Sequence, residues 1–254
     1  MLKALIFDVD GTLADTERDG HRVAFNQAFA AEGLRIVWDE ALYGDLLSVT
    51  GGKERLTYFF THTRPDLRPP GDLLPIVQRL HALKTKIYGQ LLGAGAIPLR
   101  PGVLRLVREA RAEGLRLAIA TTTTPENLEP IWKAMAPDAR GWFQSVAAGD
   151  CVPAKKPAPD VYEYVLAELG LTADECLAFE DSENGLRAAL GAGLKTIVTV
   201  TDYTKAQNLT GALLVVDHLG EPDRPLTRTC GVPFTSPYVD VRALRALSDI
   251  RVRK

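Results

Sequence analysis

Short apolar runs alternate with helical segments along most of the chain. The apolar runs are four to six residues long, which is typical of buried parallel strands. They lie at 2–6, 115–120, 145–148, 176–179, 195–200 and 213–216. The segments between the later runs are predicted to be helices, and glycines such as Gly114 and Gly170 mark their ends. This alternation predicts an α/β protein in which a parallel sheet carries helices on both faces.

Residues 16–95 differ from the rest because only helices are predicted there. The predicted helices cover 17–33, 38–48, a segment that begins at Thr50, and 73–92. A polar link precedes this region, and Gly93 and Gly95 follow its last helix. We therefore expect a Rossmann-like, doubly wound core made of residues 1–15 and 96–254, with residues 16–95 inserted as an α-helical domain.

The tail after Leu219 carries no pattern that suggests chemistry. It contains four prolines, predicts a final helix near Asp240, and ends in the basic residues 251–254. Such a tail either packs against the core or is disordered.

Charge and cysteine content exclude several classes of protein. A net charge of −2 over 254 residues offers no electrostatic footprint for nucleic acid. Three widely spaced cysteines are too few for a disulfide framework or a zinc site. The N-terminal apolar run is too short for a signal peptide, and no stretch is long enough to span a membrane. We therefore expect a cytoplasmic protein without nucleic-acid or membrane partners.

Polar residues follow several of the predicted strands at the point where each strand ends. They are Asp8, Asp10, Thr121, Lys156, Glu180 and Asp181, which lie directly after a strand or in the loop behind it. Ligands of open α/β sheets bind beyond the carboxyl ends of the strands. Asp8 and Asp10 point the same way in an extended chain, so a divalent cation or a shared proton must offset their repulsion. A simple Asp-x-Asp-Gly turn is the structural alternative.

This set of residues suits phosphoryl transfer, in which catalysis is mostly positioning and charge neutralisation. Asp8 could attack phosphorus to give an aspartyl-phosphate, and Asp10 could act as general acid and base. Thr121 and Lys156 would then hold the phosphoryl oxygens. Mg²⁺ would be held by hard oxygen ligands, with Asp181 binding directly and Glu180 directly or through water.

A second anion site is predicted in the helical insertion. Two glycines in Thr50-Gly51-Gly52-Lys53-Glu54-Arg55 come before a helix, where backbone N–H groups can approach an anion. Lys53 and Arg55 add positive charge at this point. The alternative is a flexible turn followed by solvated charges, and the same alternative applies to Glu17 and His21 near the start of the insertion.

The order of these motifs resembles the haloacid dehalogenase superfamily of phosphatases. The resemblance rests on Asp8-Val9-Asp10-Gly11-Thr12, Thr121, Lys156-Pro157 and Glu180-Asp181, and it covers residues 1 to about 200. It implies the mechanism given above, with Mg²⁺ bound by Asp8, by the backbone carbonyl of Asp10 and by the acids at 180 and 181. It also implies that the insertion is a helical C1-type cap.

A narrower resemblance links the cap to CbbY-type phosphatases. It rests on the segments 16–22, 50–55, 121–123 and 156–160. Those enzymes hydrolyse xylulose 1,5-bisphosphate, an inhibitory by-product of ribulose-bisphosphate carboxylase, to xylulose 5-phosphate. The resemblance implies a role in Calvin-cycle metabolite repair, in the cytoplasm or in the plastid stroma if the source is a plant. We expect a monomer whose substrate-binding residues are Glu17, His21, Gly51, Gly52, Lys53, Arg55, Thr121, Thr122, Thr123 and Asn127.

Three other functions share parts of this pattern. A β-phosphoglucomutase-type enzyme has the same motifs and cap, and it transfers the phosphoryl group to a second sugar hydroxyl. A sugar-monophosphate phosphatase would use Lys53 and Arg55 only as cap surface. A receiver-like phosphoacceptor module also uses aspartate, metal, threonine and lysine, but it has no helical cap and places its phosphoacceptor after a later strand.

Overall fold

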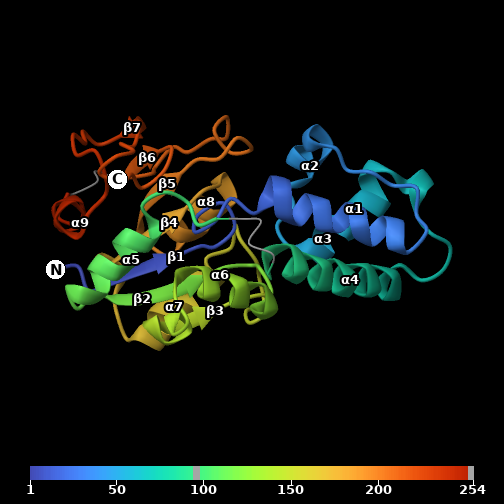
Figure 1. Cartoon of the computed structure of the whole chain (residues 1–254), viewed down its shortest axis with the longest axis horizontal. Coiled ribbons are helices and arrows are strands. Elements are labelled where there is room, and N and C mark those ends of the chain that lie inside the picture. Colours follow the sequence, from blue (N-terminus) through green and yellow to red (C-terminus); the bar gives the residue numbers. More distant parts are fainter. Residues whose placement is uncertain (94–97, 251–254) are drawn as a thin grey trace.

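A seven-stranded sheet lies at the centre of the larger part of the molecule (Figure 1). The structure is a computed structural model that describes residues 1–93 and 98–250. The strands are β1 (Ala4–Phe7), β2 (Arg116–Ala120), β3 (Phe143–Ala147), β4 (Cys176–Glu180), β5 (Lys195–Thr199), β6 (Leu214–Val216) and β7 (Arg228–Gly231). Their order is β3-β2-β1-β4-β5-β6-β7, and all neighbours are parallel except β6 and β7. The first six strands confirm the predicted apolar runs to within two residues.

Helices cover both faces of this sheet, as the predicted doubly wound fold requires. They are α5 (Val103–Ala112), α6 (Leu128–Met135), α7 (Asp160–Leu169), α8 (Glu183–Gly191) and α9 (Val241–Ser248), with short 3-10 turns at Pro125–Asn127, Ala139–Trp142 and Ala173–Glu175. Because side chains alternate along a strand, Leu5 and Phe7 of β1 pack with α5, α6 and α9. Ala4 and Ile6 pack on the other face with α7 and α8.

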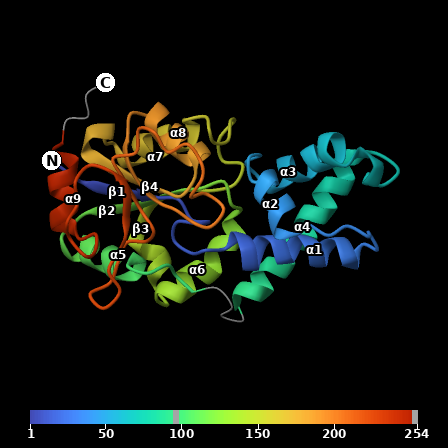
Figure 2. The same ribbon diagram turned by 90° about the horizontal axis from the view of Figure 1, so that it is seen from above.

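The segment between β1 and α5 forms a separate group of helices, which we call the helical lobe (residues 16–93). It contains α1 (Arg22–Ala31), α2 (Glu40–Leu46), α3 (Gly52–Tyr58), α4 (Leu73–Gly93), π-helical turns at Glu17–His21 and Phe59–Thr63, and a 3-10 turn at Pro65–Leu67. An aromatic core of its own, built around Phe25, Trp38 and Phe59, holds these helices together. Figures 1 and 2 show the lobe beyond the carboxyl ends of the strands. The predicted boundary at residues 95 and 96 lies outside the described residues.

The C-terminal tail packs against the core, so the first of the two expectations for it is confirmed. Helix α9 buries Val241, Leu244 and Leu247 against the sheet, and the Asp240 carboxylate accepts a hydrogen bond from the Ala243 N–H at 2.7 Å. Strand β7 was not predicted, because its four residues are all exposed and form no apolar run. The basic end at 251–254 lies outside the described residues.

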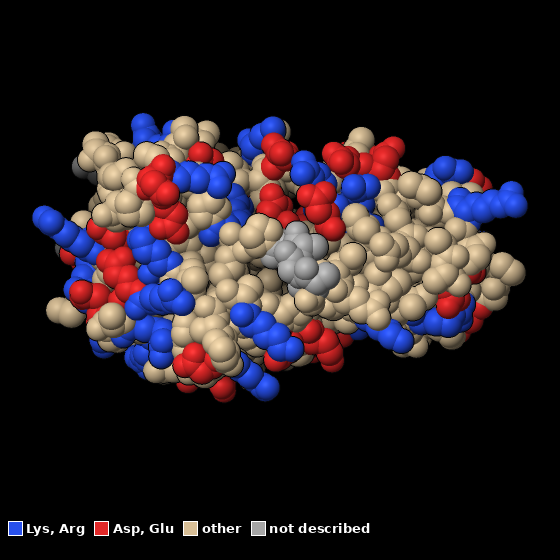
Figure 3. Space-filling model, viewed as in Figure 1, with Lys and Arg blue, Asp and Glu red and all other residues tan. Residues whose placement is uncertain are grey.

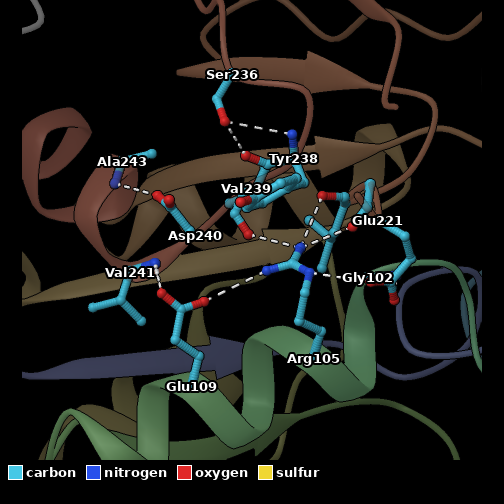
Figure 4. Close-up of polar contacts among 12 residues, drawn as sticks. Gly102, Arg105, Glu109, Glu221, Ser236, Tyr238, Val239, Asp240, Val241 and Ala243 are labelled. Carbon is cyan, nitrogen blue, oxygen red and sulfur yellow. Dashed lines mark hydrogen bonds and ion pairs between the residues drawn. The ribbon is translucent and has the colours of Figure 1, made fainter. Parts of the chain in front are cut away.

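Polar contacts hold the tail to α5 (Figure 4). The Arg105 guanidinium donates to the carbonyl oxygens of Gly220 at 2.8 Å and of Val239 at 3.0 Å. The guanidinium also packs against Tyr238, with its central carbon 4.6 Å from the centre of the aromatic ring. The tail is therefore packed against the domain as an ordered part of it.

Acidic and basic side chains share the surface of the molecule. Lys and Arg are interspersed with Asp and Glu over the face shown in Figure 3. Within residues 1–93 and 98–250, none of the helices has the length and apolar character needed to cross a membrane.

Candidate active site

The ends of three neighbouring strands bring the predicted acids and threonine together. Strand β1 lies between β2 and β4, and Phe7 is in register with Ile119 on one side and Phe179 on the other. Asp8, Thr121 and Asp181 therefore emerge at the same edge of the sheet. Lys156 reaches this edge from the loop between β3 and α7. The expectation that these residues meet follows from the register of parallel strands, and the geometry agrees with it.

A cavity that is open in part to solvent lies over these strand ends. Its core wall includes Asp8, Thr121 and Lys156, and its opposite wall includes Gly51 and Arg55 of the helical lobe. Ligand sites are commonly found between structural units, where a few polar groups converge. The site thus lies between the sheet and the lobe.

Lys156 forms the centre of a buried charge cluster. Its ammonium group lies 2.7 Å from Asp8 Oδ1 and 2.6 Å from Glu180 Oε1, and it donates to the Ala120 carbonyl at 2.8 Å. Glu180 also accepts a hydrogen bond from the Tyr162 hydroxyl. Burial alone would lower the pKa of Lys156, but the two carboxylates raise it above its usual value, so the lysine is charged.

Three carboxylates in this cluster form a candidate cation site. Asp8, Glu180 and Asp181 each offer an oxygen, and these atoms lie within 4.8 Å of one another. Burial raises the pKa of Asp8 to about 8, in spite of Lys156, and burial together with Asp8 and Glu180 raises the pKa of Asp181 well above its usual range. A divalent cation would relieve this repulsion, and hard oxygen ligands are those that Mg²⁺ prefers. The donor set therefore fits the predicted Mg²⁺.

Glycine is required beside two of these acids. A Cβ atom at Gly11, which has a φ of +83°, would lie 2.2 Å from Asp181 Oδ2. A Cβ atom at Gly185 would lie 1.9 Å from Glu180 Oε2. Both positions let the backbone approach the carboxylates closely, so larger residues there would displace the acids.

Asp10 is held apart from the three-carboxylate group by residues of the lobe. Its Oδ1 accepts hydrogen bonds from Thr16 Oγ1 at 2.5 Å and from His21 Nε2 at 2.8 Å. Lys84 Nζ lies 2.6 Å from His21 Nδ1, so the ring accepts at Nδ1 and donates at Nε2. Burial would raise the pKa of Asp10, but His21 and Thr16 bring it below its usual value. The predicted contact of Asp10 with a metal thus depends on its backbone carbonyl.

A second cavity adjoins the first and is lined in part by α4. The two cavities share a wall formed by Asp10, Glu17, Gly51, Arg55 and Thr122. The second cavity is also lined by His21, Phe25, Gly52, His81, Lys84, Thr123, Thr124 and Asn127. Asn127 Nδ2 donates to Thr123 Oγ1 at 2.8 Å, whereas Thr124 Oγ1 and Asn127 Oδ1 are buried without a hydrogen-bond partner among the described residues.

A comparison with protein families decides the identity of this site. Residues 2–193 match the haloacid dehalogenase-like hydrolases. This chain belongs to that hydrolase family. The predicted fold class and the prediction of an enzyme are both confirmed, and the receiver-like alternative is excluded because a hydrolase family covers most of the chain.

Individual relatives narrow the similarity within the haloacid dehalogenase-like hydrolases. The chain is 49% identical to protein CbbY of Cupriavidus necator over 247 residues, which cover 96% of each chain. It also resembles the crystal structure of CbbY from Rhodobacter sphaeroides in complex with phosphate, with a TM-score of 0.79, 45% identity, and coverage of 86% of this chain and 95% of that one. A mutant of the same protein in complex with xylulose 1,5-bisphosphate matches with a TM-score of 0.79, 44% identity and the same coverage. The predicted similarity to CbbY is therefore confirmed.

The structure separates Lys53 from Arg55. Arg55 is buried and lines both cavities, and its guanidinium donates to the Tyr43 hydroxyl at 3.0 Å and to the Leu46 carbonyl at 3.2 Å. Lys53 does not line either cavity and instead pairs with Asp150 of the core. Residues two apart on a helix point about 200° away from each other, and this structure places only Arg55 at the cavities. A role of Lys53 in substrate binding stays a prediction.

The remaining predicted substrate-binding residues lie at the cavities. Glu17, Gly51, Thr122 and the others named above line one or both of them. Glu17 Oε2 accepts a hydrogen bond from the Tyr43 hydroxyl, which fixes this carboxylate at the lobe wall. Their position agrees with a role in binding, which we treat below as a proposal.

Sequence reasoning missed several residues of the site. Lys84 lies on the buried side of α4, four residues after Leu80 and four before Tyr88. A lysine within the apolar stripe of a helix is a signal that could have been noticed. Tyr203 follows β5, lines the first cavity and packs edge-on against Tyr43. No local sequence pattern predicts the contact of Tyr203 with Tyr43, because the two residues are 160 positions apart.

Proposed function

We propose that this haloacid dehalogenase-like hydrolase is a Mg²⁺-dependent sugar-bisphosphate phosphatase. Its substrate would be xylulose 1,5-bisphosphate, which is hydrolysed to xylulose 5-phosphate through an aspartyl-phosphate intermediate. The observation that carries the proposal is the pair of adjoining cavities, which share the wall that contains Asp10 and Arg55. A ligand with a phosphate at each end could place one phosphate in each of two adjoining cavities.

The proposed roles follow from the contacts of each side chain. Asp8 is the nucleophile, and Lys156, 2.7 Å from Asp8 Oδ1, holds it in place and neutralises the phosphoryl oxygens together with Thr121. Asp10 protonates the leaving alcohol and later takes the proton of the attacking water. Its hydrogen bonds to Thr16 and His21 hold it for that exchange.

The metal would be held by residues that the structure brings together. Asp8, Asp181 and the backbone carbonyl of Asp10 would bind Mg²⁺, with Glu180 directly or through water. Bound there, Mg²⁺ would neutralise charge on the phosphoryl group in transfer. Glu180 has one oxygen occupied by Lys156 and Tyr162, so its second oxygen is the one available to the metal.

The second cavity would receive the phosphate that is not transferred. Arg55 and Lys84 supply positive charge to it, and the Asn127 side chain and the Thr123 and Thr124 hydroxyls supply hydrogen bonds. Burial lowers the pKa of Lys84 to about 8, although Asp10 and Glu17 oppose this, and an anion nearby would favour its charged form. This arrangement supports a bisphosphate over a monophosphate.

The wider setting of the enzyme is also part of the proposal. Residues 16–95 would act as the C1-type cap that closes over the phosphate ester, in a chain that works as a monomer. Xylulose 1,5-bisphosphate inhibits ribulose-bisphosphate carboxylase, so removing it is a metabolite-repair step beside the Calvin cycle. We place the protein in the cytoplasm, or in the plastid stroma if its source is a plant.

A substrate panel tests this proposal. Phosphate release would be measured with Mg²⁺ present from xylulose 1,5-bisphosphate, ribulose 1,5-bisphosphate, xylulose 5-phosphate and β-glucose 1-phosphate. We expect a strong preference for the first. Conversion of β-glucose 1-phosphate to glucose 6-phosphate without phosphate release would replace the proposal with the mutase function.

Substitution of Arg55 tests the second anion site separately. Arg55→Met should lose bisphosphate turnover but keep slow hydrolysis of a small phosphate monoester. Arg35→Met is the matched control, because Arg35 is an exposed residue of the lobe that lies outside both cavities. An equal fall of both activities in Arg55→Met would mean that Arg55 supports the lobe and does not bind the second phosphate.

A further inference from the structure

A loop and a helix of the core both contact the same short segment of the helical lobe, residues 48–54. In the first contact, Lys155 Nζ lies 2.8 Å from Glu54 Oε1 and 2.9 Å from Asp150 Oδ1. Lys53 pairs with the second oxygen of Asp150. These four residues form a continuous chain of alternating charge, with two members from α3 and two from the loop that precedes α7 and faces α3 (Figure 2).

The second contact is made earlier in the same segment, at Ser48 and Thr50. Asn184, near the start of α8, donates from Nδ2 to the Ser48 carbonyl and to Thr50 Oγ1, both at 3.1 Å. The lobe segment is thus held at two points, and Gly51 lies between them at the wall of the first cavity.

The two core residues that contact the lobe segment, Lys155 and Asn184, are each close in sequence to a residue of the catalytic cluster. Lys155 directly precedes Lys156, and Asn184 comes three residues after Asp181. Lys155 therefore contacts the lobe while the next side chain contacts Asp8 and Glu180. The contact with the lobe and the contact with the catalytic cluster are thus made by adjacent residues of one loop.

We propose that Lys53, Glu54, Asp150 and Lys155 form an ion-pair latch that holds the lobe closed over the active site. Lys155 is the positioning residue that connects this closure to the placement of Lys156. The latch concerns closure alone and goes beyond the proposed substrate, because it would act on any phosphate ester that enters the cavity.

The exposure of these side chains determines how the latch responds to its surroundings. The four side chains are between 15% and 58% exposed, so salt can screen their attraction. The hydrogen bonds from Lys53 and Lys155 lower the pKa of Asp150 to about 2, so its charge is retained near neutral pH. Ionic strength, and not pH, is therefore the variable that opens the latch.

Small-angle X-ray scattering of the free protein tests closure without any substrate. Asp150→Lys places a third positive charge between Lys53 and Lys155, and we expect a larger radius of gyration than in the wild type. The double variant Lys53→Asp with Asp150→Lys restores one pair with exchanged charges and should return the radius toward the wild-type value. Glu32→Lys, which breaks the Arg79–Glu32 pair at 2.7 Å inside the lobe, is the matched control and should leave the radius unchanged.

Kinetics with a chromogenic phosphate monoester and Mg²⁺ test the link to catalysis. In Asp150→Lys we expect KM to rise about tenfold, as the loss of two exposed pairs plus repulsion implies, with kcat changed much less. Raising NaCl should increase KM of the wild type more steeply than that of the neutral double variant Lys53→Gln with Asp150→Asn. The neutral variant corrects for the effect of salt on the anionic substrate itself.

Two results would overturn the latch. One is an identical radius of gyration for the wild type and Asp150→Lys at low and high salt. The other is a rise in KM with a fall in kcat that the charge-exchanged double variant does not rescue, which would indicate a local structural defect. Both results are independent of which sugar phosphate is hydrolysed, so they leave the proposed function untouched.

Discussion

Two clusters of charged side chains, one under the C-terminal tail and one at the strand ends, each join one basic residue to several carboxylates, with opposite results. In the tail cluster, Arg105 pairs with Glu109 at 3.5 Å and with Glu221 at 3.2 Å (Figure 4). Each carboxylate also accepts a backbone N–H, Glu221 from Gly102 at 2.9 Å and Glu109 from Val241 at 3.0 Å. Every charge in this cluster has a partner.

The catalytic cluster is unbalanced. Lys156 is shared by Asp8 and Glu180, and Asp181 adds a third carboxylate to the group. Among the described residues, none donates a hydrogen bond to the Asp181 side chain, although the residue is buried. The pKa values of Asp8 and Asp181 are raised as a result of burial and of this crowding.

The balance of charge in the two clusters distinguishes a binding site from a structural cluster. Buried charges that serve stability are paired, because an unpaired buried charge is costly. A buried group with surplus charge of one sign is kept because a ligand completes it. The catalytic cluster should therefore lose activity but not stability when it loses a charge, whereas the tail cluster should do the reverse.

The largest expected effect is on the catalytic side of this comparison. Asp8→Asn removes the proposed nucleophile, and we expect turnover to fall by on the order of 10⁴-fold or more. The amide oxygen can still accept the hydrogen bond from Lys156, and one of the crowded carboxylates is gone. Phosphate release and thermal unfolding in EDTA should show an inactive protein that is at least as stable as the wild type.

Asp174→Asn is the control for this change, because Asp174 is an exposed acid away from the cluster. It should affect neither activity nor stability. Turnover of Asp8→Asn well above the background rate would rule out the nucleophile assignment. A clear loss of stability would show that the catalytic cluster is as structural as the tail cluster.

Mg²⁺ should complete the unbalanced cluster and stabilise it. A ligand that binds only the folded state adds about 2.7 kcal/mol to the free energy of unfolding at a concentration 100 times its Kd. We expect urea unfolding to shift accordingly when Mg²⁺ is added to EDTA-treated protein, and the shift to vanish in Asp181→Asn. An equal shift in that variant would place the cation elsewhere.

The tail cluster should show the opposite behaviour. Arg105→Ala leaves Glu109 and Glu221 without their partner and removes donors to two tail carbonyls. Because the cluster is only half-buried, we expect a loss of about 2 kcal/mol in the free energy of unfolding, with kcat/KM unchanged. Arg108→Ala on the same helix is the control, since its side chain is exposed. A fall in kcat/KM at full stability would contradict the division between the clusters.

The sequence predicts the catalytic cluster well because each of its acids lies next to a recognisable strand. Asp8, Thr121 and Asp181 each follow an apolar strand, and the parallel arrangement of those strands brings their ends together. The placement of Lys156 needs one more assumption, namely that its loop folds back over the same edge. Family motifs supply it, and the 2.7 Å contact with Asp8 agrees.

The parts that the sequence did not predict depend on helix phase or on distant pairing. Whether Lys53 or Arg55 faces the cavity depends on where α3 begins, and a shift of one residue turns each side chain by about 100°. Strand β7 forms only because β6 offers an open edge, and its own residues carry no apolar signal. The tail cluster likewise joins residues more than 100 positions apart, such as Arg105 and Glu221.

A pH dependence should belong to the catalytic cluster alone. In the metal-free protein the pKa of Asp8 is raised by burial to about 8, from 3.8 in the unfolded chain. Between these values the folded state keeps a proton that the unfolded state releases, so this group stabilises the fold fully below about pH 4 and loses that contribution as the pH rises toward 8. Its slope cannot exceed about 1.4 kcal/mol per pH unit.

The measurement is the difference between the free energies of unfolding of the wild type and of Asp8→Asn, in EDTA at several pH values from 5 to 8. His81, whose pKa is lowered by burial to about 4, titrates in both proteins and so cancels from the difference. We expect the difference to fall steadily as the pH rises, helped by Asp181, whose raised pKa depends in part on Asp8. The slope should disappear when Mg²⁺ is added, because a bound cation keeps the carboxylates ionised. Parallel curves in EDTA would mean that Asp8 is ionised without metal and that Lys156 alone balances it, in which case the two clusters would not differ in kind.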